Sequence, residues 1–427
     1  MPSVLPWNIS AGGIRMRAVI MAGGKGTRVA SVSTVLPKPM LPICGKPVLQ
    51  HQIECLRRQG ITEITLTIGY LGRQISDYFG DGRKFGVQID YIMEEEPLGT
   101  AGALYYLKQK VTEDFLLING DLIFDVDVHR LMGFHKRKKA AVTLLAHPND
   151  HPYDSGIILA DTDSRVTGWL TKEDERGWYH NLVNAGLHVI SPTLLEKLDG
   201  PRKVDLDREI LKPLIPTGKV FVYHSPEYIK DMGTPDRIAQ VEQDLETRLV
   251  GNKNLSQRQR AVFLDRDGTI NRYVGFLRKP EELELLDGAA EAIRRINRSG
   301  YLAIVVTNQP VIARGEVTWE CLDEIHRKLE TLLGREGAYL DGIFVCPHHP
   351  DRGFPGERPE YKIDCSCRKP KPGLLLQAAE RYNIELEKSW MIGDQPQDEA
   401  AGKAAGCRSV LVSEGYSLMD AVRKIGL

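Results

Sequence analysis

Two stretches of the chain share one local pattern: residues 17–28 read RAVIMAGGKGTR, and residues 260–271 read RAVFLDRDGTIN. Each begins with a basic residue, continues as a short apolar run and ends in a turn rich in glycine or aspartate. A short apolar run bounded by turn residues is typical of a buried strand, and open α/β sheets bind ligands at the carboxyl ends of their strands. We therefore expect two α/β domains, each with a functional turn after its first strand.

The residues after each stretch alternate between helix and strand patterns. Residues 49–56 carry apolar side chains at helical spacing, and residues 61–69, ITEITLTIG, alternate apolar residues with threonine. The second half repeats this order, with a helical stripe at 289–296 and a buried strand at 301–309. Strand, helix and strand form a βαβ unit. The predicted fold class is therefore α/β, with two doubly wound, Rossmann-like domains.

The length and composition place the domain boundary. A chain of 427 residues exceeds one ordinary domain, and LVGNKNLSQRQR before the second stretch is polar and prone to turns. We predict a leader extension at 1–15 that the active site does not use, a first domain at 16–248, a linker at 249–259 and a second domain at 260–427.

Charge and hydropathy exclude several classes of partner. The net charge is −1, without a basic stripe, so we expect no nucleic acid to bind. No run approaches the ~20 apolar residues that span a bilayer, and residues 1–15 lack both the basic start and the apolar middle expected of a signal peptide. Seven cysteines are too sparse for a disulfide framework. We expect a cytoplasmic protein with small-molecule substrates and no membrane association, and leave open whether it forms a homo-oligomer.

The first turn is suited to phosphate. Gly23, Gly24 and Gly26 let the backbone approach an anion near a helix N-terminus. A P-loop would need lysine and then serine or threonine after the last glycine, and a dinucleotide fingerprint would need glycine in place of Val29. A tight turn without a ligand is the structural alternative.

Further motifs follow in a fixed order: Arg28, Lys38, GTAGAL at 99–104, Asp121 in INGDL, NAGLHV at 184–189, and Asp231 in KDMGTPDR. Together they resemble the sugar-1-phosphate nucleotidyltransferase family over residues 16 to about 245. The stretch VASVSTVLPKP departs from the usual run before the family's lysine and makes the local loop shape uncertain.

This resemblance implies the following site. The nucleotide would bind at Gly23, Gly24, Gly26, Thr27, Arg28, Lys38, Gly99, Thr100 and Gly102, with Arg28 and Lys38 also serving catalysis. Mg2+ would be held by Asp121 and Asp231, and the sugar phosphate by Lys172, Asn184 and Gly186. A sugar-1-phosphate oxygen would attack the α-phosphorus and expel pyrophosphate, so the reaction needs no protein nucleophile.

The second turn places two carboxylates at one strand end. Asp265 and Asp267 can act as nucleophile and as acid/base, although such a pair is often only a solvated turn. Further along the chain come Thr307 with Asn308, then Lys369 in CRKPKPG, then Asp394 and Asp398 in MIGDQPQDEAAG. This order resembles the haloacid dehalogenase superfamily of phosphatases.

That second resemblance implies an aspartyl-phosphate on Asp265 and protonation of the leaving oxygen by Asp267. Phosphoryl or sugar-phosphate contacts would come from Thr307, Asn308, Arg368 and Lys369. Mg2+ would be held by Asp265, Asp394 and the carbonyl oxygen of Asp267.

Three cysteines cluster in the second half. Cys346, His348, Cys365 and Cys367 form a C-x-H and a C-x-C pair, which suits a closed, structural tetrahedral zinc site. A set of buried thiols is the alternative, and His349 is a possible substitute for His348. The remaining thiols, Cys44, Cys55, Cys321 and Cys407, are expected to be merely buried.

The zinc loop, DRDGTIN and CRKPKPG together resemble the D-glycero-D-manno-heptose 1,7-bisphosphate phosphatases, with histidinol-phosphate phosphatases as near relatives. Pro310 and Val311 depart from the usual Ser-Gly, so the loop that faces the substrate is expected to differ. The segment between the metal ligands is also longer than usual.

The fusion predicts consecutive reactions. Removing the 7-phosphate gives heptose 1-phosphate, which a transferase of this type would convert to an NDP-heptose, with GDP-D-glycero-α-D-manno-heptose as the expected product. Two alternatives stay open: a phosphatase of histidinol or glycerol phosphate joined to another sugar nucleotidyltransferase, or one domain that is a non-catalytic regulatory module.

Overall fold

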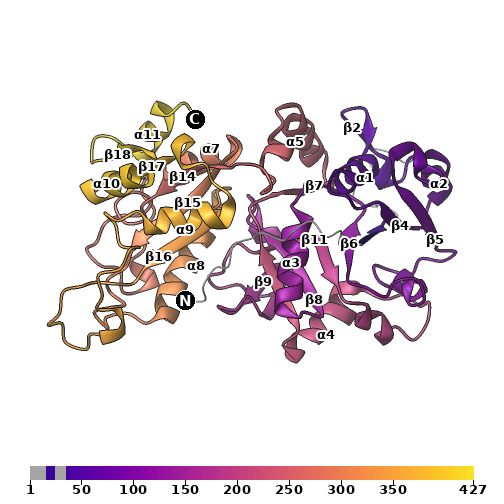
Figure 1. Cartoon of the computed structure of the whole chain (residues 1–427), viewed down its shortest axis with the longest axis horizontal. Coiled ribbons are helices and arrows are strands. Elements are labelled where there is room, and N and C mark those ends of the chain that lie inside the picture. The colour runs from indigo at the N-terminus through magenta and orange to yellow at the C-terminus, as the bar shows by residue number, and fades with distance from the viewer. Residues whose placement is uncertain (1–15, 25–34) are drawn as a thin grey trace. The chain divides into compact units, whose positions relative to one another are not determined.

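The computed structural model describes residues 16–24 and 35–427, and it divides into two compact units (Figure 1). Unit 1 draws its residues from Met1–Ala146, Ile158–Trp169 and Asn184–Asn254. Unit 2 comprises His147–Ile157, Leu170–Val183 and Leu255–Leu427. Two short segments that lie between strands of the first half of the sequence are therefore counted with unit 2.

The main sheet of unit 1 follows the order β10-β9-β11-β6-β1-β4-β5, with β8 paired to β11 and β12 paired to β8. Its strands are β1 (Arg17–Met21), β4 (Glu63–Ile68), β5 (Gln88–Met93), β6 (Phe115–Asn119), β8 (Val142–His147), β9 (Ile157–Ala160), β10 (Val166–Leu170), β11 (Val183–Ile190) and β12 (Val220–His224). β1 runs parallel to β4 and β6, whereas β11 runs antiparallel to β6 and β9. The sheet is therefore mixed.

Smaller elements surround this sheet. The paired strands β7 (Leu122–Asp125) and β13 (Tyr228–Asp231) run antiparallel, as do the short β2 (Pro42–Ile43) and β3 (Lys46–Pro47). The helices of unit 1 are α1 (Val48–Arg58), α2 (Gly72–Phe79), α3 (Val128–Lys138), α4 (Lys212–Leu214), α5 (Pro235–Glu246) and α6 (Leu249–Asn252).

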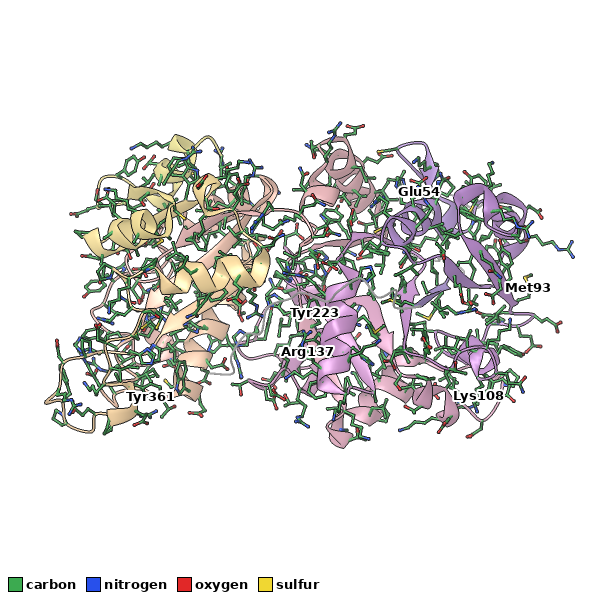
Figure 2. All side chains as sticks on the ribbon, in the orientation of Figure 1. Glu54, Met93, Lys108, Arg137, Tyr223 and Tyr361 are labelled. Atoms are coloured by element: carbon green, nitrogen blue, oxygen red, sulfur yellow. The ribbon has the colours of Figure 1, made fainter. Side chains whose placement is uncertain are left out.

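Helix α1 packs its predicted apolar face against the sheet. Leu49, Ile53 and Leu56 are fully buried in one core with β1 and β4. Glu54 lies toward the surface (Figure 2) and forms an ion pair with Lys46 at 2.8 Å. Full burial of each such aliphatic side chain contributes about 1.5–3 kcal/mol, which fixes α1 against the strand that precedes the glycine turn.

Unit 2 contains a fully parallel five-stranded sheet in the order β16-β15-β14-β17-β18. Its strands are β14 (Arg260–Leu264), β15 (Tyr301–Asn308), β16 (Gly342–Cys346), β17 (Trp390–Gly393) and β18 (Arg408–Leu411). Its helices are α7 (Ala289–Arg298), α8 (Trp319–Arg335), α9 (Gly373–Tyr382), α10 (Pro396–Ala405) and α11 (Leu418–Lys424).

The central strand β14 packs against helices on both faces. Val262 and Leu264 share a core with α7, α8 and α11, whereas Ala261 and Phe263 share a core with α9 and α10. A strand buried on both faces reads as a continuous apolar run, which explains the sequence RAVFL. The doubly wound α/β arrangement predicted for this half is confirmed, and Figure 1 shows its strands and helices in salmon to yellow.

Within residues 16–24 and 35–427, no helix is both long enough and apolar enough to cross a bilayer. The leader predicted at 1–15 lies outside the described residues.

Candidate active sites

A cavity of about 330 Å³ lies at the carboxyl ends of β1, β4 and β6 in unit 1. Its walls are Met21, Ala22, Gly23, Gly24, Lys38, Pro39, Thr67, Glu94, Gly99, Thr100, Ala103, Leu104, Asn119, Gly120 and Asp121. The cavity thus brings together Gly23, Gly24, Lys38, Gly99, Thr100 and Asp121, all of which were predicted site residues. Gly26, Thr27 and Arg28 lie outside the described residues.

The glycine turn packs against a carboxylate that the sequence analysis did not single out. A Cβ at Gly23 would lie 2.6 Å from Oε1 of Glu94, so the backbone of the turn passes close to the end of this side chain. Oε2 of Glu94 accepts a hydrogen bond from the backbone N–H of Leu98 at 3.1 Å. Burial raises the pKa of Glu94, although the hydrogen bond from Leu98 opposes the shift. Glu94 thus places two acceptor oxygens at the wall of the cavity.

The loop that carries Gly99 and Gly102 is held against residues 202–204. A Cβ at Gly99 would lie 2.4 Å from the carbonyl oxygen of Val204, and one at Gly102 would lie 2.0 Å from that of Arg202. Gly99 also has φ +76°, a conformation that favours glycine. Gly102 does not line the cavity itself. It permits the close backbone packing that shapes this wall.

The two aspartates predicted to hold a metal lie at the same end of the β7–β13 pair. Leu122 pairs with Asp231, and the backbone N–H of Met232 donates to the carbonyl oxygen of Asp121 at 2.9 Å. Oδ2 of Asp121 forms an ion pair with Nζ of Lys38. Both carboxylate oxygens of Asp231 accept from Arg237, at 2.7 and 2.8 Å. Each carboxylate is therefore neutralised by a nearby cation in this structure.

The predicted sugar-phosphate residues are only partly brought to this cavity. Gly186, at φ +71°, lies against the wall, because a Cβ there would be 2.3 Å from Nδ2 of Asn119. Asn184 precedes it on β11 and is partly buried. Lys172 is exposed, belongs to the Leu170–Val183 segment of unit 2 and does not line the cavity.

A second constellation lies at the carboxyl ends of β14 and β17 in unit 2. Asp265, Asp394 and Asp398 bring carboxylate oxygens within 4.8 Å of one another. Nζ of Lys369 lies 2.7 Å from Oδ1 of Asp265 and 2.6 Å from Oδ1 of Asp398. Burial raises the pKa of Asp265 to about 6, although Lys369 opposes the shift. Asp265, Lys369 and Asp398 are all buried, so their charges interact strongly.

Asp267 is surrounded by donors. Oδ2 accepts from Nη2 of Arg266 at 2.9 Å and from Nε2 of Gln309 at 2.8 Å. Oδ1 accepts from Nδ2 of Asn271 at 3.0 Å. Nε2 of Gln309 also lies 2.8 Å from Oγ1 of Thr307, which links two predicted site residues.

Two further predicted residues, Asn308 and Arg368, form hydrogen bonds with backbone groups near the site. Nδ2 of Asn308 donates to the carbonyl oxygen of Lys369 at 3.0 Å, and the N–H of Lys369 donates back to Oδ1 of Asn308 at 3.1 Å. This reciprocal pair fixes the loop that carries the buried lysine. Nη1 of Arg368 donates to the carbonyl oxygen of His348 at 3.1 Å and ties that loop to the cysteine cluster.

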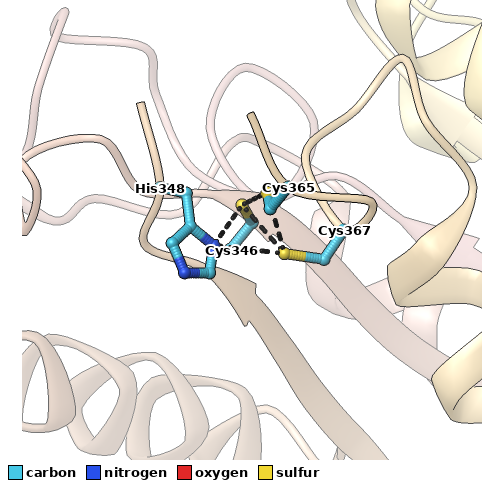
Figure 3. A group of neighbouring side chains, drawn as sticks. All are labelled: Cys346, His348, Cys365 and Cys367. Carbon is cyan, nitrogen blue, oxygen red and sulfur yellow. Dashed lines mark hydrogen bonds between the residues drawn. The ribbon is translucent and has the colours of Figure 1, made fainter. Parts of the chain in front are cut away.

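Figure 3 shows that four side chains converge in unit 2, those of Cys346, His348, Cys365 and Cys367. The three Sγ atoms lie 3.2–3.5 Å apart, and Nδ1 of His348 lies 3.3 Å from Sγ of Cys367. Thiolates bound at 2.3 Å in a tetrahedron would be about 3.8 Å apart. The cluster could therefore hold a metal ion with little rearrangement, and His348 rather than His349 is its nitrogen donor.

Comparisons with known proteins match the two halves of the sequence to different families. The family described as nucleotidyl transferase matches residues 17–248, and that described as HAD-hydrolase-like matches residues 366–425. The chain belongs to the nucleotidyl transferase and HAD-hydrolase-like families. Both resemblances predicted from the sequence are confirmed.

Individual relatives match one half each. The transferase half is 34% identical to D-glycero-alpha-D-manno-heptose 1-phosphate guanylyltransferase of Aneurinibacillus thermoaerophilus, over 54% of this chain and 99% of that protein. It is 33% identical to mannose-1-phosphate guanylyltransferase of Mycobacterium tuberculosis, over 53% of this chain and 64% of that protein. The phosphatase half is 40% identical to D-glycero-beta-D-manno-heptose-1,7-bisphosphate 7-phosphatase of Pasteurella multocida, over 39% of this chain and 88% of that protein.

Several residues of the two sites were missed by sequence reasoning. Glu94 and Asn119 line the transferase cavity, and Arg266, Asn271 and Gln309 surround Asp267. The run EEE directly before PLGTAG was a usable signal for Glu94. The others depend on loop conformations that place side chains from separate strands together.

Proposed function

We propose that the chain is a bifunctional enzyme. It hydrolyses the 7-phosphate of D-glycero-D-manno-heptose 1,7-bisphosphate, and it transfers GMP from GTP to the resulting heptose 1-phosphate, releasing pyrophosphate. The observation that carries this proposal is the joining, in one chain, of two halves whose relatives have complementary names. One relative is a heptose-bisphosphate 7-phosphatase, and the other is a guanylyltransferase for a heptose 1-phosphate.

The phosphatase half would act through a covalent intermediate. A carboxylate oxygen of Asp265 attacks the 7-phosphorus, the bond to the sugar oxygen breaks, and Asp267 gives that oxygen its proton. Water then attacks the aspartyl-phosphate and returns a proton to Asp267, which releases inorganic phosphate and restores Asp265. Thr307 and Lys369 would hold the phosphoryl oxygens, with Asn308 and Arg368 supporting the substrate through the loop contacts described above.

The acidic cluster beside Asp265 fits Mg2+. Oδ1 of Asp394 is buried and has no hydrogen-bond partner among the described residues, as expected for a ligand atom that awaits a cation. When ionised, Asp265, Asp394 and Asp398 outnumber Lys369 by two charges. Asp265, Asp394 and the carbonyl oxygen of Asp267 would hold the ion. When bound, it would offset negative charge on the phosphoryl group.

The transferase half would bind the triphosphate beside Gly23, Gly24 and Lys38, and we retain Gly26, Thr27 and Arg28 in that role. An oxygen of the sugar 1-phosphate attacks the α-phosphorus as the bond to pyrophosphate breaks. Asp121 and Asp231 would hold Mg2+, which offsets charge during transfer. Carboxylate oxygens are ligands that this ion prefers, and here they are paired with Lys38 and Arg237. Lys172, Asn184 and Gly186 would contact the sugar phosphate.

Glu94 supports the choice of guanine. Guanine presents two adjacent donors, N1–H and N2–H, which match the two oxygens of a carboxylate. Uracil and thymine flank one N–H with carbonyl oxygens, and adenine and cytosine place an acceptor beside their amino group. A half-buried carboxylate in the nucleotide cavity therefore favours guanine and repels the other bases.

Substitution Glu94→Gln tests this choice, because the amide keeps the shape of the side chain and removes one acceptor. We expect kcat/KM for GTP to fall about 10–100-fold, in line with a lost charged hydrogen bond of about 1.5–3 kcal/mol. The values for the other nucleotides should change much less. Steady-state rates with each of four nucleoside triphosphates provide the measurement, and an unchanged preference for GTP would exclude Glu94 as the selective group.

The order of the two reactions requires both sites to accept the same anomer at C1. Hydrolysis at C7 leaves C1 untouched, so both sites must accept one anomer for the reactions to be consecutive. The named relatives differ, with beta in the phosphatase and alpha in the guanylyltransferase. We propose the α-anomer, which is the anomer in the name of the guanylyltransferase relative, because transfer to the 1-phosphate leaves the C1–O bond intact. Rates measured with each anomer of the bisphosphate test this choice.

We further propose that the cysteine cluster holds a structural Zn2+, because three thiols and one imidazole match its preferred donors. A reducing cytoplasm suits both these thiols and the nucleotide substrate. We also propose domain boundaries at 16–248 and 260–427, joined by a linker at 249–259.

The proposed function is tested by incubating the full chain and Mg2+ with heptose 1,7-bisphosphate and each of four nucleoside triphosphates in turn. Mass spectrometry should detect GDP-heptose, free phosphate and pyrophosphate in the GTP reaction. Hydrolysis rates measured with histidinol phosphate and glycerol phosphate test the alternative substrates. Faster hydrolysis of either compound than of the bisphosphate would overturn the assigned substrate.

A further inference from the structure

Arg266 lies between the two aspartates of the D-x-D turn and has no role in the proposed reaction. Its side chain is 0% exposed. A buried guanidinium is costly unless its donors are paired, so the groups it contacts indicate what it stabilises.

The guanidinium bridges Asp267 and helix α8. On one side, Nη2 and Nε donate to the Asp267 carboxylate, at 2.9 Å to Oδ2 and 3.2 Å to Oδ1. On the other side, Nη1 lies 3.1 Å from Nε2 of His326, which is also buried. Arginine offers only donors, so Nε2 of His326 must be the acceptor and the imidazole must be neutral. Burial, with the nearby Arg266 charge, lowers the pKa of His326 well below its usual value, in agreement with this.

The arrangement defines the direction of the Asp267 carboxylate. Arg266 donates hydrogen bonds to both carboxylate oxygens of Asp267, while Asn271 and Gln309 each donate to one of them. Proton transfer to a leaving oxygen requires an acid held within hydrogen-bonding reach, and small displacements are costly. These donors fix the direction of the ionised carboxylate, which is the form that takes a proton from the attacking water and later gives it to a leaving oxygen.

We infer that Arg266, anchored from behind by His326, is a positioning residue that orients Asp267 for proton transfer to the leaving sugar oxygen. This inference rests on the proposed phosphatase function. It concerns two side chains that are not among the residues proposed to hold the phosphoryl group.

The leaving group provides a readout that a merely structural role would not give. An alkoxide from a sugar phosphate needs a proton as it leaves, whereas 4-nitrophenolate leaves without one. Faulty orientation of Asp267 should therefore slow hydrolysis of the sugar phosphate more than hydrolysis of 4-nitrophenyl phosphate. Single-turnover release of nitrophenolate isolates the first step from later hydrolysis of the aspartyl-phosphate.

The experiment compares the full chain with its Arg266→Lys, His326→Leu and His326→Gln variants on heptose 1,7-bisphosphate and 4-nitrophenyl phosphate. For Arg266→Lys and His326→Leu, kcat for the bisphosphate should fall about 10²–10³-fold, within the usual worth of an acid catalyst, with KM nearly unchanged. The nitrophenolate rate should fall less than tenfold. His326→Gln should recover most of the loss, because its amide oxygen can accept from Arg266.

Leu329→Ala is the matched control, since this core residue lies on the same helix three positions beyond His326. It should lower thermal stability without changing the ratio of the two rates. Equal losses on both substrates in His326→Leu, or no rescue by glutamine, would overturn the inference even if Arg266→Lys fails to fold. Wild-type protein that hydrolyses neither substrate would instead overturn the proposed phosphatase function on which the inference rests.

Discussion

His188 is a titratable side chain in the interior of unit 1. It lies on β11, opposite Leu117 of β6, and is 2% exposed. Its Nδ1 has no hydrogen-bond partner among the described residues. Burial lowers the pKa of His188 to about 4. A neutral imidazole is therefore favoured in the folded sheet, whereas the unfolded chain binds a proton near pH 6.5.

This difference predicts a local dependence of stability on pH. Between pH 6.5 and 4 the unfolded state binds more protons, so folding stability decreases as the pH falls through this window. At pH 5 the loss due to His188 should reach about 2 kcal/mol, and His188→Leu should abolish it. Hydrogen–deuterium exchange of β6 and β11 at pH 7.5 and pH 5 measures the difference.

Val189→Ala serves as the control for this pH effect, because it weakens the same strand without a titrating group. It should lower protection equally at both pH values. If His188→Leu and wild type lose the same protection on acidification, His188 does not carry the effect.

The sequence identified those site residues that follow a strand within a short motif. Asp265 and Asp394 were predicted in this way, whereas Lys369 was predicted from the CRKPKPG motif, and the structure brings the three together. Glu94 was missed because its contact with Gly23 joins the ends of two different strands. No spacing rule in a single sequence gives the conformation of the loops between them.

At the scale of elements, the loop at 98–102 depends on contact with residues 202–204. The N–H of Ala101 donates to the carbonyl oxygen of Val204 at 3.0 Å, and the N–H of Val204 donates to that of Leu98 at 3.0 Å. Because Gly102 abuts the carbonyl oxygen of Arg202, a methyl group there must push two backbone segments apart.

Gly102→Ala should therefore displace this wall of the nucleotide cavity. We expect KM for the nucleoside triphosphate to rise at least tenfold, while the phosphatase rate stays within twofold of wild type. Gly200→Ala is the matched control, because a Cβ there meets no atom within 4 Å. Transferase kinetics that are equal in the two variants would contradict the proposed role of this packing.

The cysteine cluster is predicted to hold one zinc ion per chain and to order the loop before Lys369. Cys365→Ser should reduce bound zinc and lower the thermal stability of unit 2 together, because binding energy at such a site is folding energy. Cys321→Ser is the control, since Cys321 lies outside the cluster. Elemental analysis and calorimetry provide the measurements. Wild-type protein that is purified without chelator and contains no zinc would refute the prediction.

Element types were largely predictable from sequence, but strand direction was not. The apolar run of β1 and the stripe of α1 appeared as expected. The antiparallel course of β11 did not follow from its sequence, because an apolar run fits either direction. The segments His147–Ile157 and Leu170–Val183 were likewise not recognisable as parts of unit 2.

At the scale of the whole molecule, each half contains its own set of reactive groups. The transferase cavity includes Lys38 and Asp121, and the phosphatase cluster includes Asp265, Asp394 and Lys369. A non-catalytic regulatory half would be expected to lose some of these groups. The presence of these groups in both halves therefore favours two working catalysts in one chain.

The most direct test compares two variants of the full chain on heptose 1,7-bisphosphate with GTP. Asp265→Asn removes the nucleophile, so it should lower phosphatase turnover by several powers of ten while still converting supplied heptose 1-phosphate. Asp121→Asn weakens the proposed metal site of the transferase, so heptose 1-phosphate should accumulate.

Product analysis by mass spectrometry should find GDP-heptose from the bisphosphate when the two variants are mixed, but almost none from either alone. Failure of folded Asp265→Asn to transfer GMP to supplied heptose 1-phosphate would contradict the account of two independent, consecutive catalysts.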